Sequence, residues 1–158
     1  MSKEIEFVNN YSDQIIDILK NLPRDPFDEI MQTLQAAREA GKVVYTCGNG
    51  GSAAAASHMA CDFGKNTRQE GKTRVKAVCL NDNVPAVMAY ANDEGYDIIF
   101  SEQLESLGNR DDVLIAISGS GNSANILKAI ETAKKKGMKV IGLTGFKGGK
   151  MKDKVEIC

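Results

Sequence analysis

The chain has 158 residues, of which 42% are hydrophobic, and this length and composition suit one domain with a continuous core. Its 20 Lys and Arg residues against 21 Asp and Glu residues leave a formal net charge of −1, without the basic excess that direct binding of nucleic acid needs. The amino terminus has no apolar signal-peptide core and no stretch of about 18 apolar residues occurs, so we expect a cytoplasmic protein that makes no membrane contact.

Two helices are expected before the first strand. Residues 3–20 place apolar side chains at helical spacing among charged ones, and the break NLPRDP follows. In the second helix, Asp25 suits the N-cap, Pro26 the first helical position and Gly41 the end.

After these helices, short apolar strands alternate with helical segments. The expected strands, in chain order, are KVVYTC, VKAVCL, DVLIAIS, MKVIGLT and KVEIC. Helices are expected over 53–63, in stretches that end near Leu107, and over 122–136. This alternation predicts a parallel sheet with helices on both faces. In such a sheet ligands bind beyond the carboxyl ends of the strands, where two unusual loops occur.

The first of these loops, GNGGS, follows the first strand. Gly48, Gly50 and Gly51 allow torsions and close approaches that side chains forbid. Ser52 opens a helix whose free amides favour an anion. The pattern predicts a phosphate site, although the glycines alone are equally typical of a tight strand-to-helix turn.

The second loop lies in ISGSGNSANI, residues 117–126. Ser118, Ser120 and Ser123 stand with two glycines between a strand and a helix start, and together they offer hydroxyl and amide groups. A loop that offers hydroxyl groups and contains no Lys or Arg is suited to binding a phosphate monoester. Two such loops therefore favour a phosphate ligand over a plain turn.

A dinucleotide site is the competing interpretation, because GNGGSA matches G-x-G-x-x-A after a strand. Such a site also needs an acidic residue about 20 positions on, at the end of the second strand. Here the second strand ends later, at CLND, and the lysine of a GxxxxGK[ST] phosphate loop is absent. We therefore expect no nucleotide cofactor.

The segments CGNGGSAAAASH, SGSGNSANI and LTGxxGGKM resemble the sugar isomerase (SIS) domain family, and within it the phosphoheptose isomerases. The resemblance implies a three-layer α/β/α sandwich of flavodoxin-like type with a five-stranded parallel sheet. It also implies one SIS domain over 1–158, with amino-terminal helices over 1–41 and a phosphosugar-binding core over 42–158. A homotetramer with active sites between subunits is expected.

The activity implied by this resemblance is the conversion of D-sedoheptulose 7-phosphate to D-glycero-D-manno-heptose 7-phosphate, a step in the biosynthesis of lipopolysaccharide or capsule. Such isomerases move a proton between adjacent carbons through an enediol. By the same resemblance, the three loop serines hold the phosphate. The residues expected to line the sugar and phosphate beside them are Asn49, Gly50, Gly51, Ser52 and Asn122.

Two acidic residues follow the second strand, and their roles stay open. Asp82 is a candidate for binding sugar hydroxyls at the strand ends, as is Asp93 in the AND tripeptide. Helix caps and turn residues are an equally good interpretation of both. Asp82 is kept among the expected substrate-binding residues.

His58 and Asp62 stand where the family places a His and a Glu four residues apart. Residues at i and i+4 share a helix face, so the two side chains can converge on a substrate or on zinc, which some family members bind. The resemblance makes Asp62 the candidate catalytic base. A helix residue at a subunit contact is the alternative for His58. The cysteines lack metal-knuckle spacing and are expected to be reduced: Cys47, Cys61, Cys79 and Cys158.

The family continues beyond KDKVEIC into a helix that carries a second His and a Gln, whereas His58 is the one histidine here. We therefore expect a longer parent chain, and the activity of these 158 residues is in question. An alternative function is a non-catalytic phosphosugar-binding protein that acts through a protein partner such as the bacterial replication initiator. The His58 and Asp62 pair favours the enzyme.

Overall fold

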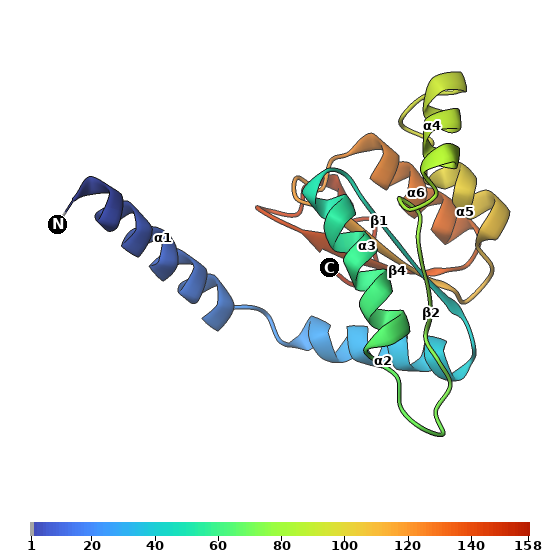
Figure 1. The fold of residues 1–158 in the computed structure, drawn as a ribbon, viewed down its shortest axis with the longest axis horizontal. Helices are drawn as coiled ribbons and strands as arrows, with labels where there is room; N and C mark the ends of the chain where they lie inside the picture. The colour runs from blue at the N-terminus through green and yellow to red at the C-terminus, as the bar shows by residue number, and fades with distance from the viewer. Residues whose placement is uncertain (1) are drawn as a thin grey trace.

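The computed structural model describes residues 2–158 (Figure 1). Its helices are α1 (Lys3–Lys20), α2 (Asp25–Glu39), α3 (Gly51–Lys65), α4 (Val84–Asp93), α5 (Ser101–Leu107) and α6 (Ala124–Lys135). Its strands are β1 (Val43–Gly48), β2 (Lys76–Cys79), β3 (Val113–Ser118) and β4 (Lys139–Thr144), and a short 3₁₀ helix, η1 (Gly149–Met151), follows β4. The element order confirms the predicted alternation after two amino-terminal helices.

The strands form one parallel sheet in the order β2-β1-β3-β4. The described residues give four strands, so the prediction of a fifth strand at KVEIC is wrong. Ile157 makes only an isolated bridge with Ile141. The Val140 N–H donates to the carboxylate of Glu156 at 3.0 Å. Because a side-chain oxygen takes the place of a strand carbonyl, the ladder does not extend beyond one residue.

Two helical layers cover the sheet, as the sequence predicts. α2 and α3 pack on one face, and α5 and α6 pack on the other (Figure 1). The core on the α5 and α6 face includes Leu104, Leu114, Ile126, Ile130 and Val140. The core on the opposite face includes Ala37, Val44, Val113, Ile115 and Ile141. Strands buried on both faces explain the continuous apolar runs in the sequence.

Helix α1 extends away from the rest of the chain (Figure 1). None of its residues is buried, and Phe7 and Ile18 are 69% and 62% exposed. Its apolar face therefore adds nothing to the core of this chain. Within residues 2–158, no helix has both the length and the apolar character required to cross a membrane.

The start of α2 differs from the prediction. Arg24, not Asp25, holds the N-cap position, and no side chain caps the helix. The Phe27 N–H already donates to the Arg24 carbonyl at 3.0 Å, which places Asp25 inside the first turn. Gly41 follows the helix with φ +66°, so the predicted end is confirmed.

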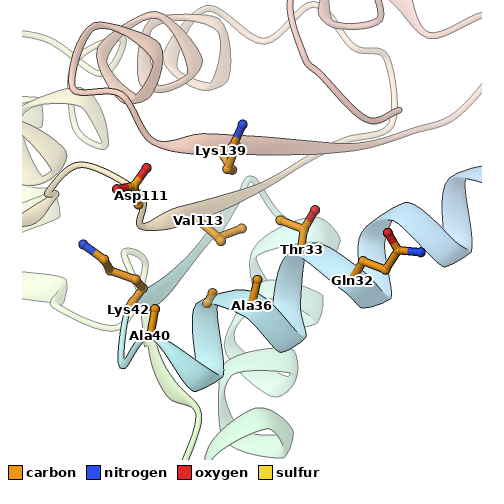
Figure 2. Close-up of a pocket in the computed structure, with 9 residues that line it drawn as sticks. Gln32, Thr33, Ala36, Ala40, Lys42, Asp111, Val113 and Lys139 are labelled. Atoms are coloured by element: carbon orange, nitrogen blue, oxygen red, sulfur yellow. The ribbon is translucent and has the colours of Figure 1, made fainter.

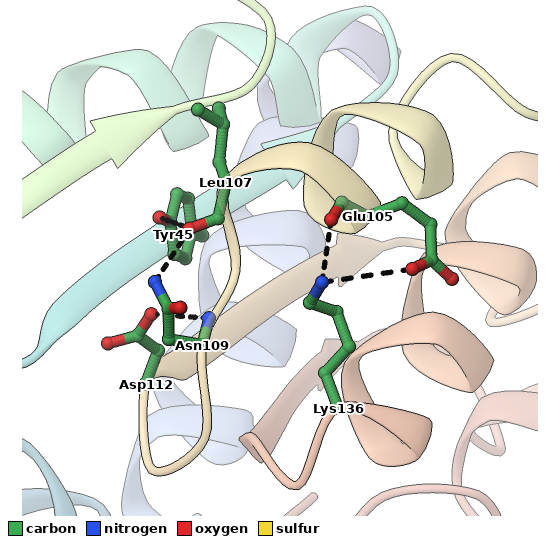
Figure 3. A network of polar contacts seen from close by, with 6 residues as sticks. All are labelled: Tyr45, Glu105, Leu107, Asn109, Asp112 and Lys136. Carbon is green, nitrogen blue, oxygen red and sulfur yellow. Dashed lines mark hydrogen bonds and ion pairs between the residues drawn. The ribbon is translucent and has the colours of Figure 1, made fainter.

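Polar contacts connect β1 and α5 with the residues just before β3 and just after α6, at the amino-terminal edge of the sheet (Figure 3). The Tyr45 hydroxyl donates to the Leu107 carbonyl at 2.9 Å, and Asp112, only 2% exposed, accepts the Asn109 N–H at 2.8 Å. Lys136 donates to a backbone carbonyl of α5 at 2.6 Å. Burial, and to a smaller extent the Asp112 carboxylate, raises the pKa of Tyr45. This network braces the edge opposite the two loops.

A hollow of about 450 Å³ lies at the same edge, between α2 and the starts of β1, β3 and β4 (Figure 2). Its lining includes Thr33, Ala36, Ala40, Lys42, Asp111 and Lys139. Ligands of open parallel sheets bind beyond the carboxyl ends of the strands. The candidate site therefore lies at the other edge.

Candidate functional site

The first loop connects β1 to α3 at the carboxyl edge of the sheet. A Cβ on Gly48 would lie 2.4 Å from the Ser52 carbonyl oxygen, so the helix starts tight against the strand end. Gly50 has φ +54° and ψ −122°, a conformation that other residues rarely adopt. No side chain caps α3. Its Ser52 and Ala53 N–H groups already donate to carbonyls of the first loop, both at 3.0 Å. The Gly51 N–H is therefore the amide of the first turn that stays available to an anion.

Asn81, directly after β2, holds the first loop in place. Its Oδ1 accepts the Gly48 N–H at 3.1 Å, and its Nδ2 donates to the Gly48 carbonyl at 2.8 Å. The side chain thus extends the pairing of β1 with β2 by one step. Asn81 was not predicted as a site residue, although its place directly after a strand at this edge of the sheet could have indicated one.

The second loop, residues 118–123, gathers three hydroxyls between β3 and α6 and is called the serine loop below. The Oγ atoms of Ser118 and Ser123 are 3.2 Å apart, and the Ser120 Oγ accepts a backbone N–H within the loop at 3.2 Å. Ser123 stands at the N-cap of α6, but its hydroxyl makes no capping bond. Hydroxyls and a helix amino terminus together are good partners for a phosphate monoester.

A third loop, residues 145–151, lies against the serine loop. The Met151 N–H donates to the Gly121 carbonyl at 3.0 Å. A Cβ on Gly121 would lie 1.9 Å from the Gly148 carbonyl oxygen. Glycine is therefore required where the two backbones meet, and this contact fixes the shape of the serine loop.

Asn122 uses both ends of its side chain within this contact. Its Nδ2 donates to the Ser120 carbonyl at 2.8 Å, and its Oδ1 accepts the Lys150 N–H at 3.1 Å. These bonds give Asn122 a role in holding the loop. Its predicted contact with a ligand stays a prediction.

Asn49 joins the first loop to Asn125, in the first turn of α6 directly after the serine loop. The Asn49 Nδ2 donates to the Asn125 Oδ1 at 2.9 Å, and the Asn125 Nδ2 donates to the Asn49 Oδ1 at 2.8 Å, although 76 positions separate the residues. The Tyr96 hydroxyl also donates to the Asn49 Oδ1, at 2.9 Å. Neither Asn125 nor Tyr96 was predicted from the sequence to take part in the site. Nothing local in the sequence pairs them with Asn49.

His58 and Asp62 lie farther along α3. Their side chains are 78% and 46% exposed, and the His58 Nε2 is 3.5 Å from the Asp62 Oδ2. Asp62 also accepts the Asn66 amide at 2.7 Å. At a rise of about 1.5 Å per residue, His58 lies about 9 Å and Asp62 about 15 Å along the helix from Ser52. The structure thus confirms that the two side chains share a helix face, and it places them away from the serine loop.

Asp82 borders a different hollow, together with Ser57, Cys61 and Cys79. Its N–H donates to the Cys79 carbonyl at 3.2 Å, as expected of a turn residue. The next residue, Asn83, caps α4 through its side chain. Sugar binding by Asp82 stays a prediction.

The residues present do not by themselves fit a zinc ion. Within residues 2–158, no group of three or more His, Cys, Asp and Glu side chains is arranged to hold a metal. His58 and Asp62 supply two donors, whereas a structural zinc site has four protein ligands and a catalytic site three.

The sequence of this chain is similar to a known domain family and to proteins of that family. The sequence profile of the SIS domain family matches residues 9–145. The phosphoheptose isomerase of Rhodospirillum rubrum is 48% identical over 77% of this chain and 63% of its own length. The phosphoheptose isomerase of Helicobacter pylori is 43% identical over 87% of this chain and 69% of its own length. This chain thus spans less than two thirds of the length of the Rhodospirillum relative.

The fold also matches a solved structure throughout the chain. The structure of a phosphoheptose isomerase from Francisella tularensis superposes with a TM-score of 0.90 at 31% identity. The match covers 98% of this chain and 82% of the Francisella chain. The likeness therefore includes both amino-terminal helices as well as the sheet.

Proposed function

The chain belongs to the SIS domain family, and we propose on that premise that it binds a sugar phosphate across its two loops and isomerises it. The observation that carries the proposal is the pair of hydrogen bonds between Asn49 and Asn125. These bonds join the first loop to the start of α6, directly after the serine loop, so both loops lie at the carboxyl ends of neighbouring strands. The fold supports one SIS domain, with helices over 1–41 and a phosphosugar-binding core over 42–158.

The serine loop binds the phosphate in this proposal. Ser118, Ser120 and Ser123 donate hydroxyl hydrogens to phosphate oxygens, and the amino terminus of α6 adds backbone amides. The α3 amino terminus, with Gly51 and Ser52 in its first turn, faces the same ligand. The third loop holds the serine loop in one conformation before the ligand binds, so less conformational entropy is lost on binding.

The substrate we propose is D-sedoheptulose 7-phosphate, and the product is D-glycero-D-manno-heptose 7-phosphate. In this substrate the phosphate at C7 and the reacting carbons, C1 and C2, stand at opposite ends of the carbon chain. Asp62, lying beyond the loops along α3, is the proposed base that moves a proton between C1 and C2 through an enediol. His58 is the neighbouring group within reach of Asp62.

The same proposal includes a homotetramer in the cytoplasm. The exposed apolar face of α1 supports assembly, because apolar patches of this kind mark protein interfaces. The exposure of His58 and Asp62 is consistent with a site completed by another subunit. A non-catalytic protein acting through the replication initiator is not favoured, since the curated relatives described above are phosphoheptose isomerases.

Zinc binding by His58 and Asp62 stays a prediction. Their two donors require further ligands from elsewhere in an assembled enzyme. Activity and metal content measured on the same sample, with and without a chelator, test this prediction. Full activity in a metal-free sample would rule zinc out of the reaction.

The test of the proposed function is conversion of sedoheptulose 7-phosphate by the wild-type chain and by Ser120→Ala. Ser106→Ala is the matched control, because Ser106 is exposed on α5. We expect turnover by the wild type and the control, and weaker binding of substrate by Ser120→Ala. If the wild type binds the sugar phosphate without converting it, the proposed isomerase activity is wrong. If it does not bind the sugar phosphate, the proposed phosphate binding by the two loops is wrong as well.

A further inference from the structure

The side chain of Asn49 is held by three hydrogen bonds within the chain. The Oδ1 accepts from the Asn125 Nδ2 and from the Tyr96 hydroxyl, and the Nδ2 donates to the Asn125 Oδ1. Asn125 is only 3% exposed, so its side chain is fixed in the core under the two loops. Asn49 is thus part of a defined network rather than a free surface amide.

A backbone amide sets the direction of every bond in this network. The Ile126 N–H donates to the Asn125 Oδ1 at 3.0 Å, and a backbone N–H can only donate. The atom facing it must therefore be the amide oxygen of Asn125. This leaves the Asn125 nitrogen to face the oxygen of Asn49, which resolves the usual ambiguity of amide orientation.

The network determines what Asn49 can offer a ligand. An amide oxygen has two lone pairs, and both are taken, by Asn125 and by Tyr96. Of the two N–H groups, one is bound to Asn125. Asn49 therefore presents one N–H donor and no acceptor.

We propose that Tyr96 and Asn125 are positioning residues that hold Asn49 as a hydrogen-bond donor toward an oxygen of the sugar. The proposal rests on the proposed function, because it concerns the same sugar phosphate. In the proposed function the serine hydroxyls and the amino terminus of α6 bind the phosphate. Asn49 lies in the first loop, beside them, and is therefore placed to contact the sugar. Its donor suits a carbonyl or hydroxyl oxygen of the sugar.

The turn that carries Tyr96 is itself anchored to α6. Lys128 of α6 forms an ion pair with Asp97, and the hydrogen bond from Lys128 lowers the pKa of Asp97. Gly95, with φ +125°, allows the turn to bend after α4. Tyr96 and Asn125 therefore both reach Asn49 from segments attached to one helix.

Tyr96 also offers a clean test, because it is 57% exposed and contributes little to the core. Tyr96→Phe removes only the hydroxyl. Tyr45→Phe is the matched control, since it removes one hydroxyl bonded to the Leu107 carbonyl at the opposite edge of the sheet. Affinities for sedoheptulose 7-phosphate and for inorganic phosphate are measured by calorimetry, together with the melting temperature.

We expect Tyr96→Phe to weaken binding of sedoheptulose 7-phosphate by about threefold to tenfold, the size of one neutral hydrogen bond. Its affinity for inorganic phosphate and its melting temperature should stay those of the wild type. Tyr45→Phe should lower the melting temperature and change neither affinity. The proposal is overturned if Tyr96→Phe binds both ligands more weakly by the same factor, or if it binds both as tightly as the wild type does.

A second readout separates this inference from the proposed function. Side-chain amide exchange of Asn49, followed by NMR without any ligand, should be about threefold to tenfold faster in Tyr96→Phe than in the wild type. Unchanged exchange overturns the positioning role whatever the enzyme binds. If the wild type binds inorganic phosphate but no sedoheptulose 7-phosphate, the proposed function fails and the sugar contact fails with it, while faster exchange still supports the positioning of Asn49.

Discussion

Replacement of Gly121 by alanine tests whether the third loop holds the serine loop. Gly121 has φ +65°, and its Cβ would lie 1.9 Å from the carbonyl oxygen and 2.6 Å from the carbonyl carbon of Gly148. Both obstacles are backbone atoms, so no side-chain rotation can relieve the overlap. The substitution must displace one of the two loops.

Two effects should lower the free energy of unfolding of Gly121→Ala. A non-glycine residue in the left-handed region costs about 1–2 kcal/mol. Overpacking of a close contact adds about 1–3 kcal/mol. The total of about 2–5 kcal/mol is a large fraction of the usual stability of a domain. For a chain of this size it corresponds to a fall in melting temperature of about 4–20 °C.

The control is Gly119→Ala in the same loop. A Cβ on Gly119 meets no atom within 4 Å, and its φ lies outside the left-handed region. Thermal unfolding followed by circular dichroism should place Gly119→Ala within about 1 kcal/mol of the wild type. Equal melting temperatures for Gly119→Ala and Gly121→Ala would refute the interlocked-loop argument.

Three further predictions follow from the same structure. Gly48→Ala should lower the melting temperature by several degrees, whereas Gly51→Ala, which meets no atom within 4 Å, should not; similar values for the two variants would contradict the close approach of α3 to β1. Burial, with a smaller effect of Cys79, raises the pKa of the Cys47 thiol. Above about pH 8.5 the unfolded chain therefore releases this proton while the folded chain keeps it, so the Cys47 thiol should make the unfolding free energy fall as the pH rises. Denaturant titrations from pH 7 to 10 should show a smaller fall in Cys47→Ala, and an unchanged fall would contradict the buried neutral thiol. Asp62→Asn should abolish turnover of sedoheptulose 7-phosphate and leave binding of inorganic phosphate unchanged, since the carboxylate lies away from the serine loop; retained turnover would exclude Asp62 as the base.

Much of the fold could be predicted from local patterns in the sequence. The helix at residues 3–20, the end of α2 at Gly41 and the strand-to-helix alternation were predicted because amphipathic spacing and glycine act over a few residues. The fifth strand failed for a non-local reason. Its apolar letters suit a strand, but the Glu156 carboxylate takes the Val140 N–H that strand pairing would need.

The sequence by itself determined that two glycine and serine loops follow apolar strands, and that each precedes a helix. It also determined that His58 and Asp62 share a helix face, because the helical repeat alone sets that relation. Only the tertiary structure decided that the first loop contacts the start of α6, beside the serine loop. Strand order places β1 beside β3, and Asn49 then reaches Asn125 across 76 positions of the chain. Hydrogen bonds between residues so far apart depend on how the strands assemble, which no local pattern encodes.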